Sequence, residues 1–600
     1  MSRTLLARPQ RRILVVLTVV AMAVGLAGLV QPSVHAATGS GSGLPETHPF
    51  MPGDDNMAGE DAHSRAHSPS RIPAAHVPTP ATLPVVGDPA ALSTAGVTLK
   101  DQRDADNGNA FSDEPPDQAL CASPTQVLEG VNEVFATYDH SGTKTSGNET
   151  YDMFYNGVPA IDRSPDADPD HIFGPFMSDP KCYWDPGTQR FYMVMLELGL
   201  DGATGDFNGD SWTDIAVSKS PTATTDPSGW WMYQIDERND GSPDTTTGVT
   251  GTTLPTHPGC PCLGDQPLIG ADANGFFIST NEFSIDGPEF NGAQEYAFDK
   301  QGLADGTLRV QRFDAVNPPL AEGVAYSVQP ATSPASGDWS AANHGTEFAL
   351  SALEFTGGLD NRIATWAFTN TASLATATPD VHLSKVVVGS EVYGAPPKVA
   401  QKPGPYPLGQ ALKEKLAFLE SNDDRMNQTV YAGGRLWSGV NTVVKAANGP
   451  TTTGIAYFVV QPTAPTTNTA SVTATMANQG YVAVNRDSVF FPSIGVTSGG
   501  TKAAMVFTLA GPGSYPSTAY IRLTPAGAVS GPVSVYAAGT KPYDGASAYA
   551  AFGGGGVARW GDYSAAVASG NTIWLAAEWV PGDFGFPPYQ ANWGTAIGAV

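Results

Sequence analysis

The stretch Asp265–Ile278, DQPLIGADANGFFI, decides the fold prediction, because it joins an acidic start, a tight turn and an apolar run. Short runs of β-branched and aromatic residues bounded by Gly, Pro, Asn and Asp are typical of strands joined by turns. The same order recurs with varying clarity in six other segments: Asp117–Leu128, Asp179–Phe191, Glu347–Ile363, Asp424–Trp437, Ser488–Met505 and Asp562–Trp574. Recurrence of one unit predicts an all-β repeat architecture.

The spacing of the turns predicts the number of units. The turns lie at Pro124, Gly187, Gly275, Gly358, Gly434, Gly500 and Gly570. A four-stranded blade needs ~40–50 residues, so each interval holds one blade with longer loops. We predict a β-propeller of seven irregular four-stranded blades, with six or eight blades, or a pair of stacked sandwiches, as alternatives. Too few strands follow the last turn to complete a blade, so we expect a segment near Ala95–Lys100 to close the ring.

Composition agrees with this architecture and excludes other classes. The chain has 600 residues, of which 66 are Gly and 50 are Pro, and only 15% are charged. A helical bundle would need far more Ala, Glu, Lys, Leu and Arg. The net charge of −27 argues against nucleic acid as a partner, because phosphate binding requires clusters of Lys and Arg.

The N-terminal region predicts export. Residues 1–36 combine a basic start, an apolar run from Ile13 to Val30 and a small-residue cleavage site before Ala37, which is typical of a signal peptide. A retained membrane anchor is the alternative. Residues 37–110 resemble a disordered tether rich in Pro, Gly, Ser and His, and residues 111–600 form the predicted propeller. We therefore expect a secreted protein, either released or held at the cell surface, with no membrane span after signal removal.

An acidic motif predicts a calcium site. In DFNGDSWTD, oxygen ligands from Asp206, Asn208, Asp210 and Asp214, with the carbonyl of Trp212, match the preference of Ca²⁺ for several hard oxygens on a tight loop. The segment resembles the calcium loop of integrin-α-type propeller repeats, which lies between two strands of a blade. The alternative is a solvated acidic hairpin tip.

The four cysteines predict two disulfides, since export favours oxidation. They are Cys121, Cys182, Cys260 and Cys262. A bond between Cys260 and Cys262 would close a strained loop, so we expect each to pair with Cys121 or Cys182, in either order. A zinc site made by the four thiols is the alternative.

The recurring acids are candidates for an active site at the propeller axis. Innermost strands converge there, so Asp117, Asp179, Asp265, Glu347, Asp424 and Asp562 are expected to approach one another. Arg425, Arg559 and Tyr563 lie beside these acids, and two carboxylates with such neighbours are parts that a glycosidase uses. The catalytic candidates are thus Asp424, Arg425, Arg559, Asp562 and Tyr563. The alternative is that each acid caps the first turn of its own blade.

Two further resemblances concern the fold and the cellular location of the protein. The segment Thr225–Trp230 resembles the Asp-box turn of sialidase propellers, which marks the fold, although no three-arginine set typical of that family can be placed. Segments including Asp265–Phe283 and Arg559–Ser564 resemble a group of exported bacterial propellers of unassigned activity.

The leading hypothesis is a secreted, calcium-stabilised propeller that binds an extracellular glycan or protein through its channel face. A polysaccharide hydrolase or lyase, and a purely structural surface protein, are the alternatives, and neither ligand nor oligomeric state follows from the sequence.

Overall fold

Repeated four-stranded antiparallel sheets build the protein, which is described here from a computed structural model. The structure describes residues 76–88, 92–313, 320, 323–353, 358–416, 418–446 and 449–600. The predicted signal peptide and the first part of the predicted tether lie outside these residues. Within them, no helix is long and apolar enough to cross a membrane.

The first three sheets follow the chain strand by strand. Their strands are β3 (Ala119–Ala122), β4 (Val127–Val131), β5 (Val134–Tyr138) and β6 (Glu149–Thr150); β7 (Phe176–Asp185), β8 (Arg190–Leu200), β9 (Phe207–Ser218) and β10 (Trp230–Asp236); and β11 (Cys262–Ala271), β12 (Gly275–Ser284), β13 (Phe290–Asp299) and β14 (Val310–Phe313). Each strand pairs antiparallel with the next, so each sheet is a meander.

Three more meanders follow. Their strands are β15 (Gln329–Thr332), β16 (Thr346–Ala352), β17 (Leu359–Thr369) and β18 (His382–Gly394); β20 (Thr429–Ala432), β21 (Arg435–Lys445), β22 (Thr451–Thr463) and β23 (Thr473–Val482); and β24 (Ser488–Val496), β25 (Ala503–Gly511), β26 (Ser514–Leu523) and β27 (Val529–Ala537). β15 also pairs in parallel with β20, which joins two meanders at their inner edges.

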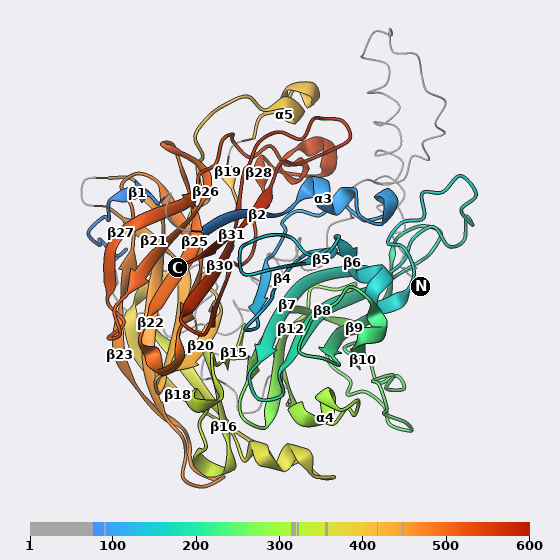
Figure 1. Ribbon diagram of the computed structural model, residues 1–600, viewed down its shortest axis with the longest axis vertical. Helices are drawn as coiled ribbons and strands as arrows, with labels where there is room; N and C mark the ends of the chain where they lie inside the picture. Colours follow the sequence, from blue (N-terminus) through green and yellow to red (C-terminus); the bar gives the residue numbers. More distant parts are fainter. Residues whose placement is uncertain are drawn as a thin grey trace, which may run out of the picture.

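The last sheet joins the two ends of the described chain. It contains β29 (Ala565–Ser569), β30 (Thr572–Trp579) and β31 (Gly594–Ala599), and its outer strand is β2 (Leu92–Thr98), paired antiparallel with β31. In Figure 1, β2 in blue lies beside the red strands of the C-terminus. The N-terminal closing strand predicted from the sequence is therefore confirmed. It lies within the stretch 37–110 predicted to be a tether, so the propeller begins earlier than residue 111.

The sheets are arranged as the blades of a β-propeller. The first strands contact one another in a closed order, β3, β7, β11, β15, β20, β24, β29 and again β3. Apolar clusters fill the space between neighbouring blades rather than a single central core. Figure 1 shows the teal and green blades on one side of the molecule and the orange and red blades on the other. The central axis is thus lined by strands that are far apart in the sequence.

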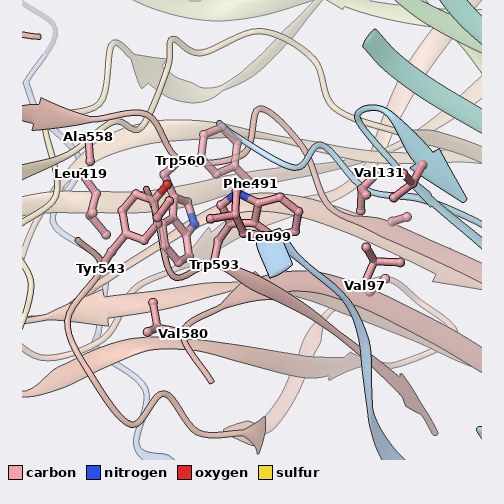
Figure 2. Packing of buried hydrophobic residues seen from close by; sticks show 14 of the residues in the cluster. Val97, Leu99, Val131, Leu419, Phe491, Tyr543, Ala558, Trp560, Val580 and Trp593 are labelled. Carbon is pink, nitrogen blue, oxygen red and sulfur yellow. The ribbon is translucent and has the colours of Figure 1, made fainter. Parts of the chain in front are cut away.

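Short elements lie outside the four-stranded meanders. They are β1 (Val85–Gly87), which pairs in parallel with β27, the two-stranded pair β19 (Phe418–Leu419) and β28 (Val557–Ala558), and the helices α3 (Leu99–Arg103), α4 (Lys300–Ala304) and α5 (Pro407–Leu412). Trp560, Trp593 and Tyr543 pack together with Leu99 from α3 (Figure 2). Trp560 and Tyr543 meet edge to face, with ring centroids 5.0 Å apart. This cluster anchors the N-terminal segment to the last blade.

Candidate functional site

Four acidic side chains from different blades gather where the inner strands begin. Asp117, Asp179, Asp265 and Asp562 all act electrostatically on Lys181 and on Tyr563, and the Lys181 ammonium lies over the Tyr563 ring. We call these six residues the channel-mouth cluster. They come from four blades, so the radial arrangement brings them together. Glu347 does not join them, because it lies in β16, the second strand of its blade, where Asp272 and Lys300 act on it.

Two of the acids are structural ties between blades. Asp117 accepts hydrogen bonds from the backbone N–H of Asp562 (2.7 Å) and from Asn132 Nδ2 (2.9 Å). Asp179 accepts one from the backbone N–H of Gln266 in the next blade (3.0 Å). Both acids are buried and have positive φ angles, 48° and 59°. They therefore hold neighbouring blades together instead of capping their own turns, which differs from the capping alternative.

Burial and crowding perturb the ionisation of the cluster. The pKa of Asp117 lies well above its usual value because of burial first, and then because of the Asp562 and Asp179 carboxylates. Burial also lowers the pKa of Lys181 to about 7, although the four acids oppose that change. Lys181 was not among the residues expected from the sequence. Its available signal was a lysine close to Asp179 on an inner strand, but a bulge between Ser178 and Lys181 breaks the regular alternation of faces there.

Asp562 remains accessible from solvent. Its side chain is 23% exposed, it accepts a hydrogen bond from Asn422 Nδ2 at 2.8 Å, and its Oδ2 lies 3.6 Å from Arg559 Nη2. Tyr563 is buried, its hydroxyl donates to the carbonyl of Pro180 at 3.4 Å, and burial followed by the nearby acids raises its pKa. Of the predicted catalytic residues, these three thus lie together.

Arg425 lies in a second polar group, formed by the segments that precede β15 and β20 together with Gln266 of β11. Its guanidinium donates to both carboxylate oxygens of Asp423 (2.8 Å each) and to Gln266 Oε1 (2.7 Å). The Tyr326 hydroxyl also donates to Asp423 at 2.8 Å. Burial alone would raise the pKa of Asp423, but the adjacent Arg425 lowers it. The sequence analysis named Asp424, which is fully buried, and missed Asp423, the acid that Arg425 binds.

The channel contains a pocket next to these groups. Inner strands of several blades line it, and its polar lining is mainly uncharged: Gln118, Gln266, Gln329, Asn427, Gln428 and Ser564. Lys181 and Tyr563 also line it. Amides and hydroxyls that donate and accept hydrogen bonds suit a ligand rich in hydroxyl groups. Trp437 and Trp560 offer no exposed ring for stacking on such a ligand, because Trp437 is buried between blades and Trp560 is buried in the cluster with Tyr543 and Trp593.

The predicted calcium loop is a strand. Residues 207–218 form β9, and its hairpin with β8 turns at residues 201–206. Asp210 faces Arg238 at 3.4 Å, Asn208 Oδ1 accepts from the backbone N–H of Asp210, and Asp214 is buried. Gly209 has a φ angle of 93°, so this end of β9 departs from a regular extended strand. In the described residues, the group of three close metal-ligand atoms is Cys260, Cys262 and Glu282.

Asp214 belongs to a buried row of carboxyl groups in the first two blades. Glu133, Asp152, Glu197 and Asp214 follow one another, and each is buried. In the described residues no ion pair joins any of these four to Lys or Arg. Burial first, and neighbouring carboxylates second, raise the pKa values of Glu133, Asp152 and Asp214. Such groups favour the protonated form and share protons with one another.

The disulfides differ from the predicted pairing. Cys121 on β3 bonds Cys182 on β7, with Cα atoms 5.5 Å apart, and Cys260 bonds Cys262, with Cα atoms 4.4 Å apart. The expectation that Cys260 and Cys262 pair elsewhere is wrong, because the turn before β11 brings their Cα atoms within the usual range for a disulfide. The radial packing of first strands places Cys121 beside Cys182, which no sequence spacing reveals.

Comparisons with known proteins give low similarity. No protein-family model and no curated protein sequence matches the chain. Among solved structures, it is similar to Trypanosoma rangeli sialidase in complex with sialic acid, with 11% identity and a TM-score of 0.32 over 78% of this chain and 57% of that chain. It is also similar to Cellvibrio cellulosa α-L-arabinanase (10% identity, TM-score 0.28, 69% and 95% covered) and to a GH43 β-1,3-galactosidase (10%, 0.26, 59% and 92%). The chain thus spans little more than half of the sialidase, and the fold assignment rests on the strand topology.

Proposed function

We propose that this protein acts on a neutral extracellular glycan at the channel mouth, as a glycoside hydrolase. The observation that carries the proposal is the convergence of four acidic residues, one lysine and one tyrosine from different blades beside a pocket whose polar lining is mainly uncharged amides. Strongly perturbed pKa values in a pocket are typical of functional sites. The export expected from residues 1–36 would bring the protein to such a substrate.

The charge of the site favours a neutral substrate. Even with Asp117 protonated, the three other acids outnumber Lys181 and Arg559, so the channel mouth has an excess of negative charge, and the whole chain carries −27. An anionic sugar would be repelled by this field, whereas hydroxyl groups can hydrogen bond to Gln266, Gln329 and Asn427.

Glycosidic cleavage needs two carboxyl groups on either side of the scissile bond, one as the acid and one as the base or nucleophile. Asp117 and Asp179 are committed to backbone N–H groups. Asp265, which is half-buried, and Asp562, which is partly exposed, are therefore the pair that we assign to the reaction. Arg559 and Asn422 would position Asp562, and Lys181 would balance the charge of the pair.

A panel of neutral polysaccharides tests the proposal. The purified protein should release reducing ends from at least one glycan, and Asp562→Asn should reduce the rate at least ~100-fold without a loss of folding. Asp168→Asn, on an exposed loop, is the matched control and should leave the rate unchanged. A glycan that is bound but never cleaved would overturn hydrolysis and leave the glycan-binding hypothesis; neither binding nor cleavage would contradict both.

A further inference from the structure

The Cys260–Cys262 disulfide lies in a different setting from the other disulfide. Cys121 and Cys182 are buried within an apolar cluster, they belong to neighbouring blades, and 61 residues separate them. Cys260 is half-buried in the turn before β11, and Cys262 is the fully buried first residue of β11. Only Pro261 separates the two cysteines. A bond that closes so short a loop restrains the unfolded chain little, so its reduction costs the fold little.

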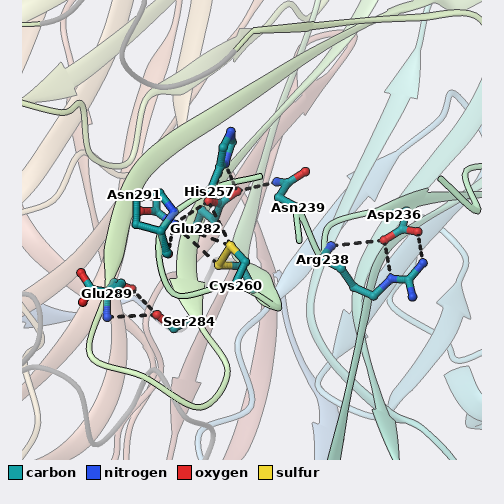
Figure 3. Close-up of a disulfide and its surroundings, with 11 residues drawn as sticks. Asp236, Arg238, Asn239, His257, Cys260, Glu282, Ser284, Glu289 and Asn291 are labelled. Atoms are coloured by element: carbon teal, nitrogen blue, oxygen red, sulfur yellow. Dashed lines mark hydrogen bonds and ion pairs between the residues drawn. A yellow bond between two sulfur atoms is a disulfide. The ribbon is translucent and has the colours of Figure 1, made fainter. Parts of the chain in front are cut away.

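Polar side chains surround this bond. Glu282 on β12 is fully buried, and its Oε1 lies 3.8 Å from Cys260 Sγ and 2.8 Å from His257 Nδ1. Glu282 also accepts hydrogen bonds from Asn291 Nδ2 (2.8 Å) and Asn239 Nδ2 (2.5 Å). Figure 3 shows these side chains converging on Glu282, with the bond beside it. A carboxylate paired with an imidazole is thus placed within reach of a cysteine sulfur.

The two sulfurs are not equivalent. Asn291 Nδ2 donates to Glu282 Oε1 (2.8 Å) and to the carbonyl of Pro258 (3.0 Å), and it lies 3.6 Å from Cys262 Sγ and 3.8 Å from Cys260 Sγ. Glu282 lies beside Cys260 and disfavours a thiolate there, whereas the polar nitrogen of Asn291 is nearest to Cys262. Solvent reaches Cys260 more readily than Cys262. The arrangement therefore distinguishes an attacked sulfur from a leaving sulfur.

We propose that Cys260–Cys262 is a reversible two-electron redox site that exchanges with small thiols or with a partner dithiol. An incoming thiolate attacks Cys260 Sγ, a new S–S bond forms, the Cys260–Cys262 bond breaks, and Cys262 leaves as a thiolate. A second thiolate attacks the incoming sulfur of this mixed disulfide and releases Cys260, which takes up a proton beside Glu282. Protonation of Cys262 completes the step. The protein gains two electrons and two protons, and two thiols are oxidised to one disulfide.

A titration with defined ratios of reduced and oxidised glutathione tests the proposal, with the Cys121–Cys182 bond as an internal control. Acid quenching, alkylation and peptide mass spectrometry report each bond separately. We expect Cys260–Cys262 to be half-reduced at a ratio at least ten times less reducing than Cys121–Cys182 requires, with an unchanged melting curve. Reduction of both bonds together, or of Cys260–Cys262 only after unfolding, would overturn the proposal.

A substitution tests the assignment of the leaving sulfur. Asn291→Leu removes the amide nearest Cys262, so at a fixed glutathione ratio the bond should be reduced about fivefold more slowly, as expected for one lost hydrogen bond to the leaving thiolate. Asn571→Leu, in an exposed turn, is the matched control and should leave this rate unchanged. Equal rates for the Asn291→Leu variant and the unmodified protein would contradict the assignment of Cys262 as the leaving sulfur.

Discussion

The position of an acidic residue on an inner strand decides whether it is available for chemistry. Asp117 and Asp179 have positive φ angles and accept hydrogen bonds from backbone N–H groups of other blades. Asp562 lies at the same channel mouth but keeps part of its surface exposed beside Arg559. The same residue type at corresponding positions thus serves structure in one blade and is open to a substrate in another.

Asp152, in the buried carboxyl row, makes stability depend on pH. Its pKa is raised in the folded protein by burial and then by Glu197, so folding favours its protonated form. That contribution is fully present below the unfolded pKa of about 4 and is lost as pH rises through the folded pKa. Asp152→Asn keeps a neutral group at every pH and should stabilise the protein by roughly 1–3 kcal/mol at pH 7, and by much less at pH 4.

Thermal unfolding of this variant at both pH values provides the measurement. Asp305→Asn, on the surface after α4, is the control and should change neither melting temperature. A lower melting temperature for Asp152→Asn at pH 7 would mean that the carboxylate form of Asp152 is needed in the fold.

At the scale of elements, the sequence of β9 fits both a calcium-binding loop and a β-strand. Its oxygen-rich spacing resembles a calcium loop, but the apolar residues after Asp214 and the pairing with β8 extend the segment into a strand. The apolar, buried second half of β9 holds the segment in the sheet, while Gly209 in its more exposed first half keeps a φ angle of 93°. The motif thus begins at Asp206 in the turn between β8 and β9 and continues into β9, where a loop between two strands was expected.

Calcium binding itself stays a prediction from the sequence. If Ca²⁺ binds there, a chelator should lower the melting temperature, because a ligand of the native state stabilises by mass action. Asp210→Asn should remove this effect of the chelator. Melting curves with excess Ca²⁺ and with chelator measure it. Identical curves under both conditions would end the calcium hypothesis for this segment.

At the scale of the whole molecule, closure of the ring depends on β2. Val97 N–H donates to Glu129 Oε2 in the first blade (3.0 Å), and Thr595 in the last blade contacts both. Gly96 lies in this narrow junction, where an added Cβ would come within 2.3 Å of Glu129 and Thr595. The closing strand thus joins the first and last blades through buried polar contacts.

Gly96→Ala should destabilise the protein by about 1–3 kcal/mol, because the methyl group forces these buried contacts apart. Chemical denaturation measures the change. Gly87→Ala, at the end of β1, is the control, since an added Cβ meets nothing within 4 Å there. Equal stability of the two variants would show that the junction yields easily and that β2 contributes little to closure.

The sequence by itself determined the all-β class, the repeated blades and the closing N-terminal strand, because alternating apolar runs and turn residues act locally. It also indicated that Asp117, Asp179, Asp265 and Asp562 would approach one another, since that follows from any radial arrangement of the repeats. Only the tertiary structure decided which groups meet: Lys181 over the Tyr563 ring and among the acids, Asp423 rather than Asp424 beside Arg425, and Cys121 bonded to Cys182. These contacts join blades that are distant in sequence, and their partners depend on the register and tilt of each sheet, which local preferences do not encode.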